Sequence, residues 1–247
     1  MDFSHPAFVP YRRLLARLPQ NRLASPAELT RLARKTGRTL RFVETNYSLS
    51  ACDYEQGILE SGAIPTRPDN LHDFMNALVW LTFPQAKANL NRLHCRALAD
   101  NPVEAKYRSP QRDALTLLDE SGVLVFTQDE EFLPLLATRR WHELFIHRRE
   151  RLVNDSDFLL LGHAVMEKLI KPRLSITSKC LVISARPASL ADADRLAATA
   201  LADVSTPKQL PPLPVAGIPG WHPHNHLPAF FDSPSIFRPL AHCTGNP

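Results

Sequence analysis

Glycine is scarce in this chain, and the positions of its glycines argue against several enzyme classes. Only 8 of the 247 residues are glycine. None of them forms the GxGxxG, GxxxxGK or GxSxG patterns, which bring the backbone close to a phosphate or expose a nucleophilic serine. The sequence therefore argues against dinucleotide-binding folds, P-loop nucleotide hydrolases and hydrolases with a nucleophile elbow.

Cysteine is rarer still. A structural zinc ribbon and a thioredoxin-type redox motif both need closely spaced CxxC pairs, and the chain has none. We therefore expect reduced thiols with no metal-binding or redox role. The four cysteines are Cys52, Cys95, Cys180 and Cys243.

Long apolar runs are also missing. No run approaches the roughly 18 residues that a membrane-spanning helix requires, and the longest candidate contains His163 and Glu167. The N-terminal segment MDFSHPAFVPYRR is interrupted by His5, Pro6 and Pro10, which is unlike a signal peptide. We expect a cytoplasmic protein with no membrane partner.

The composition is that of an ordinary globular protein. Apolar residues make up 44% of the chain and charged residues 22%, which argues against bulk disorder. The formal charge is +4, with acidic residues interleaved among the basic ones. Arg12-Arg13 and the denser cluster from Arg139 to Arg151 stand out, and each is interpreted as a solvated helix face or as a surface for nucleic acid or an acidic protein.

Helical periodicity dominates the pattern. Ser25-Pro26-Ala27-Glu28 is a capping box that predicts the start of a helix. We expect a mainly α fold with a minor β component, built as a single compact helical core. The expected helices cover about 26–34, 53–61, 70–83, 84–100, 112–120, 127–139, 140–152, 155–172 and 189–203, and the expected strands cover 39–43, 122–127 and 175–185.

The C-terminal segment differs in composition. Ten of the chain's 22 prolines fall between Pro207 and Pro247, and helical periodicity is almost absent there. The stretches LPVAGIPGW, AFF and SIFRPL carry too many large apolar groups for a solvated linker. We therefore expect a core of residues 1–206 and an extended arm of residues 207–247 that packs on it as part of the same domain.

The strongest functional signal is a pair of ionisable residues in the apolar stretch 155–172. His163 and Glu167 are four residues apart, so a helix places them on one face, where they could share a proton, a water or a metal ion. A carboxylate in apolar surroundings is costly unless it is paired or neutralised. The alternative to a functional role is a structural ion pair, for example with an arginine.

Other polar residues recur at helical spacing. Lys87, Asn91 and His94 form a stripe at the edge of an apolar face, as residues that line a cleft or ordinary boundary residues would. His72 and Asn76 form another four-residue pair on the preceding helix.

Asp73 has two interpretations. It stands three residues after Asn70, a good N-cap, and so suits the first turn of a helix. The dipeptide His72-Asp73 is also similar to the HD of metal phosphohydrolases that carry an H…HD…D pattern. The only upstream histidine is His5, which departs from that pattern.

Two further groups are candidates for binding. In RDALTLLDESG, Arg112, Thr116, Asp119 and Glu120 share one polar face and Asp113 lies near the helix start, which suits either paired carboxylates or a solvated surface. The alternating histidines of WHPHNH, at positions 222, 224 and 226, could present imidazoles to a late transition metal or simply decorate the surface.

The chain resembles an uncharacterised bacterial family that is defined by a domain of unknown function of the DUF3025 type. The resemblance rests on PTRPDNLHDFMNALVWLTFPQAKANLNRLH, RDALTLLDESG, the GHAVMEKL helix, LPVAGIPGWHP and FRP, and spans nearly the whole chain from about Tyr54. It implies that these segments, including the proline-rich arm, belong to one domain. It implies no activity, cofactor or catalytic residue.

The functional hypothesis is that the helices bearing these residues converge on one cleft around His72, His94 and His163. The enzyme would be a metal-dependent hydrolase with a small-molecule substrate and a divalent metal as cofactor. The alternative is a non-enzymatic module that binds nucleic acid or protein through Arg139–Arg151. The candidate catalytic residues are His163, Glu167, His94, His72 and Asp73; the candidate substrate-binding residues are Lys87, Asn91, Asn76, Arg112 and Asp113; and the candidate metal ligands are His163, Glu167 and His94.

Overall fold

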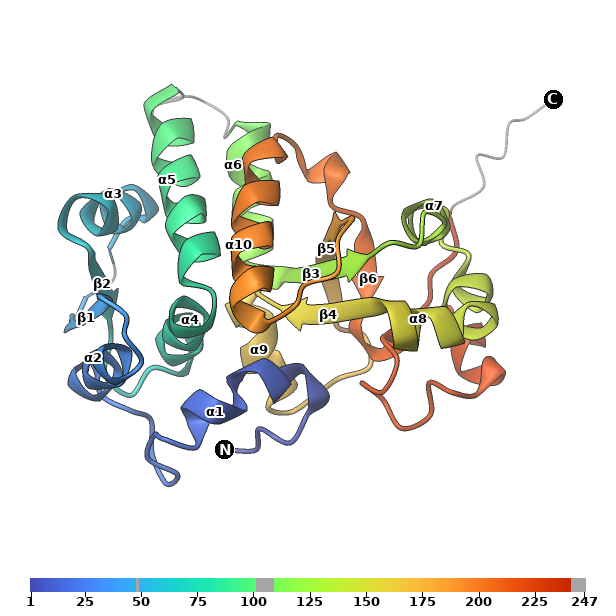
Figure 1. Cartoon of the computed structure of the whole chain (residues 1–247), viewed down its shortest axis with the longest axis horizontal. Coiled ribbons are helices and arrows are strands. Elements are labelled where there is room, and N and C mark those ends of the chain that lie inside the picture. Colours follow the sequence, from blue (N-terminus) through green and yellow to red (C-terminus); the bar gives the residue numbers. More distant parts are fainter. Residues whose placement is uncertain (48, 101–108, 241–247) are drawn as a thin grey trace.

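The structure is a computed structural model that describes residues 1–47, 49–100 and 109–240. Its N-terminal part consists of short helices and two parallel strands joined by a helix (Figure 1). The expected capping box is present, since the Ser25 hydroxyl and the Glu28 carboxylate each accept a hydrogen bond from the other residue's backbone N–H. The elements are η1 (Pro6–Tyr11), α1 (Arg12–Leu15), α2 (Pro26–Lys35), β1 (Arg41–Glu44), α3 (Ala51–Ser61) and β2 (Ala63–Thr66).

Longer helices follow and carry most of the candidate site residues. The expected N-cap of α4 is confirmed, because the Asn70 side chain accepts a hydrogen bond from the backbone N–H of Asp73. The start of α5 is capped from a distance: Asp194 of α10 accepts from the backbone N–H groups of Gln85 and Ala86 at 3.0 and 2.9 Å. This contact fixes α10 against α5 (Figure 1). The helices are α4 (Leu71–Thr82), α5 (Pro84–Asp100), α6 (Pro110–Ser121) and α10 (Leu190–Ala200), which continues into η3 (Leu201–Asp203).

A four-stranded mixed sheet packs beside these helices, in the order β4-β3-β5-β6. Strand β3 pairs antiparallel with β4 and parallel with β5, and all its residues are buried, as in a central strand. The strands expected at 122–127 and 175–185 are confirmed, and the fold is mainly α with a minor β component. The strands are β3 (Gly122–Thr127), β4 (Ser156–Leu160), β5 (Thr177–Ile183) and β6 (Pro212–Pro214).

The prediction of one buried helix over residues 155–172 is wrong. Its first part is strand β4, and the helix α9 covers only His163–Leu169. A short apolar run such as FLLL suits a buried strand as well as a buried helix. Here the run forms a strand because it pairs with β3. The helices expected at 127–139 and 140–152 are also shorter, because the chain forms α7 (Phe132–Ala137), a π-helical turn η2 (Glu143–His147) and α8 (Arg149–Asp155).

The proline-rich arm lies on the core, as expected. Its short elements are η4 (Pro207–Gln209), β6, η5 (Val215–Gly217) and η6 (Pro228–Asp232). Asn225 is buried and donates hydrogen bonds to the carbonyls of Ala216 and Ile218, which holds the arm's turns together. Residues 241–247, including Cys243, lie outside the described residues. The arm side chains buried in the common core include Leu210, Leu213, Val215, Ile218, Phe231 and Phe237.

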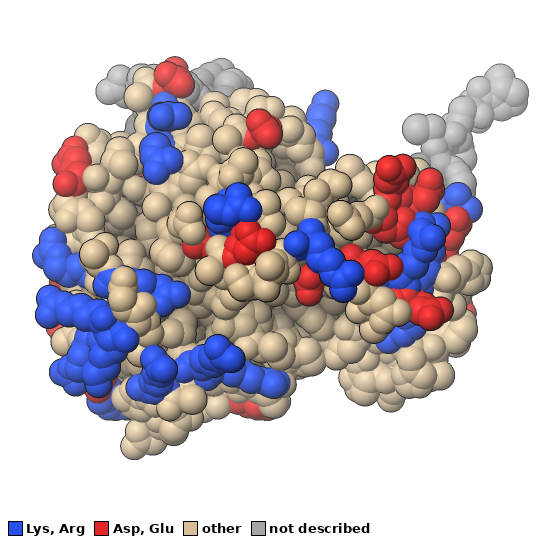
Figure 2. All heavy atoms as spheres, viewed as in Figure 1, with Lys and Arg blue, Asp and Glu red and all other residues tan. Residues whose placement is uncertain are grey.

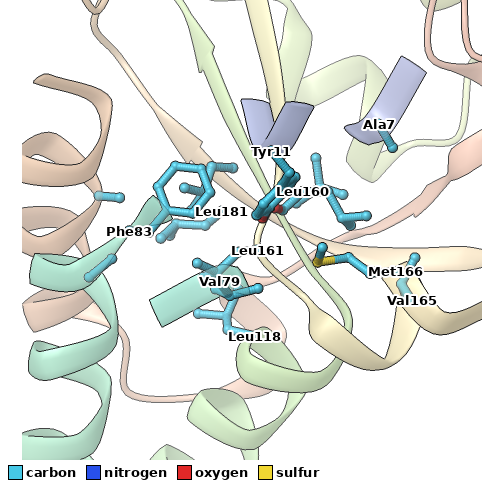
Figure 3. Close-up of a cluster of buried hydrophobic side chains, with 14 of the residues drawn as sticks. Ala7, Tyr11, Val79, Phe83, Leu118, Leu160, Leu161, Val165, Met166 and Leu181 are labelled. Atoms are coloured by element: carbon cyan, nitrogen blue, oxygen red, sulfur yellow. The ribbon is translucent and has the colours of Figure 1, made fainter. Parts of the chain in front are cut away.

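The core ties the N-terminal segment to the sheet and the central helices. Figure 3 shows Tyr11 of η1 beside Leu160 of β4 and Met166 of α9. Tyr11 is fully buried, and its hydroxyl donates a hydrogen bond to the Leu160 carbonyl. Within the described ranges, no helix is both long enough and apolar enough to cross a membrane.

Two glycines allow the chain to pass very close to itself where α9 begins. The backbone N–H groups of Leu161 and Gly162 both donate to the Gly122 carbonyl, at 2.9 and 2.8 Å. A Cβ on Gly162 would lie 2.5 Å from the Gly122 nitrogen and from the Ser121 Cα. Glycine at position 162 is therefore required for the contact between the β4–α9 junction and the α6–β3 junction.

Replacing Gly162 by alanine is expected to lower the free energy of unfolding by about 3 kcal/mol, because the added carbon meets backbone atoms that cannot move aside cheaply. Gly57→Ala is the matched control. It lies within α3 with open space around it, so it should stabilise by roughly 0.5–1 kcal/mol. Chemical denaturation measures both changes, and equal stabilities for the two variants would contradict this account of the contact.

Candidate functional site

A cavity of about 400 Å³ lies between α3, α4, α5, α6 and the start of α9. His72, His94 and His163, which the sequence grouped into one cleft, all line it. The cavity is large enough for a small molecule. Its lining residues include Tyr54, Glu55, Asp73, Asn76, Arg112, Thr116, Asp119 and Glu120.

Two histidines face each other inside the cavity. His163 is the first residue of α9, directly after Gly162, and only 3% of it is exposed. His72 lies in the first turn of α4. Their Nε2 atoms are 3.0 Å apart, and the two rings meet edge to face with centroids 4.5 Å apart. The two helix starts therefore bring one imidazole each to the same point.

Glu120 completes a possible ligand set. Its Oε2 lies 3.6 Å from His163 Nε2, and the ligand atoms of His72, Glu120 and His163 all lie within 4.8 Å of one another. Two nitrogen ligands at about 2.1 Å from one ion are about 3.0–3.4 Å apart for angles near 90–110°. The 3.0 Å separation of the two Nε2 atoms suits a shared ion as well as it suits a hydrogen bond.

Each histidine has a carboxylate near its other ring nitrogen. Asp119 Oδ2 lies 3.9 Å from His163 Nδ1, and Glu167 Oε2 lies 3.5 Å from His72 Nδ1. No hydrogen bond joins either pair, and among the described residues the buried His163 Nδ1 has no hydrogen-bond partner. A proton on Nδ1 of each ring would face these carboxylates and leave the Nε2 lone pairs free.

Glu167 differs from the sequence hypothesis. Its side chain is 42% exposed, so it is not a carboxylate held in apolar surroundings. The residue lies on α9 beside His72 and does not line the cavity, whereas His163 is buried. The four-residue spacing identified the right helix, but it joined two side chains that lie in different environments.

The side chains of Lys87 and Asn91 already bind other groups of the protein. The buried Lys87 ammonium forms a close ion pair with Asp119 and lies 5.4 Å from the centre of the Trp80 ring. The Asn91 amide donates to the backbone carbonyl and to Oε2 of Glu55, at 2.7 and 2.6 Å. These two side chains fix the carboxylates of the cavity wall.

The α4 candidates also have protein partners. Asp73 forms a two-pronged ion pair with Arg67 and accepts from the Arg67 backbone N–H at 2.8 Å. The Asn76 amide donates to the Tyr54 hydroxyl at 2.8 Å. The structure therefore gives Asp73 a role in fixing the start of α4 and gives Asn76 a role in positioning Tyr54.

Arg112 is the exception among the charged lining residues. It is 9% exposed, and among the described residues its guanidinium has no hydrogen-bond or ion-pair partner. Thr116, Asp119 and Glu120 line the cavity with it, as their shared helix face predicted. Asp113 lies in the first turn of α6 and is not among the lining residues.

Burial and neighbouring charges shift the pKa values of the cavity groups. Burial lowers the pKa of His163 to about 4, despite the opposing effect of Asp119, so this imidazole is neutral near pH 7. Burial acts to raise the pKa of Asp119, but the charge and hydrogen bond of Lys87, together with the nearby imidazoles of His163 and His94, outweigh it and lower the pKa to about 2. Burial and the charge of Asp119 raise the pKa of Glu55 to about 7, and the same two causes raise the pKa of Glu120.

The basic cluster from Arg139 to Arg151 is partly neutralised. Arg148 forms a two-pronged ion pair with Asp129, and Arg151 lies 3.8 Å from the same carboxylate. Arg140 pairs with Glu143. Arg149 holds the arm through the Asn225 carbonyl and side chain, and Arg139 donates to the carbonyl of Pro239.

The histidines of WHPHNH do not form a metal-competent group, although the rings of His222 and His224 lie with centroids 5.4 Å apart. Among the residues that the structure describes, the metal-competent group consists of His72, Glu120 and His163, and it includes none of these three. His222 instead stacks on Phe230, with centroids 4.7 Å apart.

Sequence reasoning missed Tyr54 and Glu55 of α3. Both line the cavity, although they lie in an acidic, polar stretch that looks like an ordinary surface helix. The signal that could have found them is the packing of α3 on α5, which periodicity within α3 does not reveal.

Glu55→Gln is expected to remove a pH-dependent loss of stability. The Glu55 pKa rises from its ordinary value of 4.5 to about 7 on folding, so the contribution of Glu55 to the free energy of unfolding is highest below about pH 4.5 and falls up to about pH 7. The glutamine can still accept from Asn91. The Glu55→Gln variant should be more stable than the wild type by roughly 1–3 kcal/mol above pH 7 and equally stable at pH 4. Chemical denaturation of both proteins from pH 4 to above pH 7 tests this prediction. Free energies of unfolding that change with pH in parallel for the two proteins would contradict it.

No curated protein and no solved structure matches this chain. A family model described as "Protein of unknown function (DUF3025)" matches residues 40–241, which include α3 to α10 and all of the described arm. The expected resemblance is confirmed, and the chain belongs to the DUF3025 family.

Proposed function

We propose that this protein is a metal-dependent hydrolase whose divalent metal is bound by Nε2 of His72, Nε2 of His163 and the carboxylate of Glu120. The observation that carries the proposal is the meeting of the two Nε2 atoms at 3.0 Å, with one carboxylate near each Nδ1. Metal-bound histidines usually donate a hydrogen bond from their second ring nitrogen to a carboxylate or carbonyl, and here carboxylates lie 3.5 and 3.9 Å from these nitrogens. Glu167 and His94, both candidate ligands from the sequence, take outer positions in this proposal.

Three protein ligands beside a cavity favour catalysis over a structural role. Structural zinc sites are closed by four protein ligands, whereas catalytic sites keep a position open for water or substrate. Two histidines and a glutamate form a known catalytic zinc set. A metal of this kind lowers the pKa of its bound water and so supplies a nucleophile for hydrolysis near neutral pH.

The substrate is a small molecule with an anionic group, and Arg112 binds that group. This guanidinium lines the same cavity as the three ligands and is nearly buried, and among the described residues it has no hydrogen-bond or ion-pair partner, although its charge acts on the Glu55 carboxyl across the cavity. Burying a charge without a partner is unfavourable, and a bound carboxylate or phosphate would remove that penalty. The role that the sequence gave to Lys87 and Asn91 passes to Arg112.

Metal content tests the ligand set directly. Untagged protein purified without chelator is expected to hold about one zinc or other late divalent ion per chain, measured by elemental analysis. His72→Ala, His163→Ala and Glu120→Gln should each reduce the metal content at least 10-fold. Glu167→Ala should keep the metal with about 10-fold lower affinity, because it removes only a supporting carboxylate.

His142→Ala is the control, since this histidine is half-exposed and bonds to Asp232 instead. Circular dichroism shows that each variant is folded before its metal is measured. Wild-type protein that binds no metal even after incubation with zinc, or variants that keep a full equivalent, would overturn the proposed ligand set.

The anion site is tested with benzoate on chelator-treated protein, so that its result does not depend on the metal. Ligand-observed NMR should show saturable binding, and Arg112→Gln should weaken it about 10-fold because one charge-assisted hydrogen-bonding group is lost. Arg96→Gln, an exposed arginine on α5, should leave binding unchanged. Equal binding by both variants would show that Arg112 is not the anion site.

A further inference from the structure

The net positive charge of this protein is concentrated in its first 39 residues, which precede the family-matched region. This segment holds 8 of the chain's 29 lysines and arginines but only 2 of its 25 aspartates and glutamates. Its formal charge is +6, against +4 for the whole chain, so residues 40–247 carry a net charge of −2. The basic residues are Arg12, Arg13, Arg17, Arg22, Arg31, Arg34, Lys35 and Arg38.

These charges form one exposed surface, which we call the N-terminal basic face and define by the eight residues above. All of them except the half-buried Arg38 are exposed. Figure 2 shows Lys and Arg side chains gathered at the lower left, over α2 and along α1, while acidic and basic side chains alternate over α7 and α8 on the right. The charge is therefore segregated in space as well as in sequence.

Little of this charge is neutralised by the protein. Within the described residues, Arg22 is the only member of the face in an ion pair, with Glu28 at 2.7 Å. Arg12 donates only a long hydrogen bond, 3.4 Å, to the Ser4 carbonyl. A cluster of like charges repels itself, so it is more stable with a polyanion bound.

The fold of the segment favours nucleic acid over a membrane surface as the polyanion. Helices that lie in a membrane interface insert an apolar face, but Leu14, Leu15, Leu29 and Leu32 of α1 and α2 are buried in the protein core. Seven of the eight basic residues are arginine, the side chain that best binds phosphate in two-pronged geometry.

We propose that the N-terminal basic face binds the phosphate backbone of nucleic acid without sequence preference. This activity is separate from the metal-dependent chemistry, since none of its residues lines the cavity. Binding of this kind releases counterions from the nucleic acid and therefore weakens steeply as salt rises.

The test is fluorescence anisotropy of a labelled DNA duplex of roughly 20 base pairs, titrated with the full chain over about 50–200 mM salt. Affinity should fall steeply across this range. The double variants Arg13→Glu, Arg17→Glu in or beside α1 and Arg31→Glu, Arg34→Glu in α2 should each bind at least 10-fold more weakly at the low-salt end. Each should also show a shallower salt dependence.

The control is Arg92→Glu, Arg96→Glu on α5, which makes the same change in net charge on a helix outside this face. It should keep nearly the wild-type affinity. Three results overturn the proposal: no duplex binding at low salt, an equal loss in the control, or binding to vesicles rich in phosphatidylserine without binding to the duplex. Metal content should be unchanged in the double variants, which separates this result from the metal experiment.

Discussion

The candidate site depends on the close contact between two backbone junctions. Gly122 ends α6 and begins β3, while Gly162 links β4 to α9, and the backbone hydrogen bonds between them leave no room for a side chain on Gly162. Asp119 and Glu120 precede one junction and His163 follows the other. The contact therefore sets how far the carboxylates of α6 lie from the first imidazole of α9, and α4 adds His72 from a third direction.

The pKa values of the cavity groups follow from how closely their charged and titratable side chains lie together. Four carboxyl groups, two arginines and three histidines line the cavity, with Lys87 paired to Asp119 beside it, and burial penalises every charged form. The ion pair with Lys87 keeps Asp119 ionised. The raised pKa values of Glu55 and Glu120 mark the groups for which a further negative charge is unfavourable. A divalent cation beside Glu120 would offset that repulsion, and an anion beside Arg112 would match the remaining positive charge.

Local patterns predicted most of the helices and part of the site. The caps at Ser25 and Asn70 and the helix face with Arg112, Asp119 and Glu120 follow from interactions within a few residues, which the sequence displays directly. The strand β4 and the exposure of Glu167 depend on which segment packs against which, and a short apolar run leaves that open. Tyr54 and Glu55 reach the cavity only because α3 packs on α5, a contact that has no signature within either helix.

The central claim is that His72, His163 and Glu120 hold one metal ion through both Nε2 atoms. X-ray absorption spectroscopy of the zinc-loaded protein tests it most directly, because it counts imidazole ligands and measures their distances. The account predicts two imidazoles and one or two oxygen donors at about 2.0–2.2 Å. A shell with sulfur, with oxygen alone or with a single imidazole would contradict it.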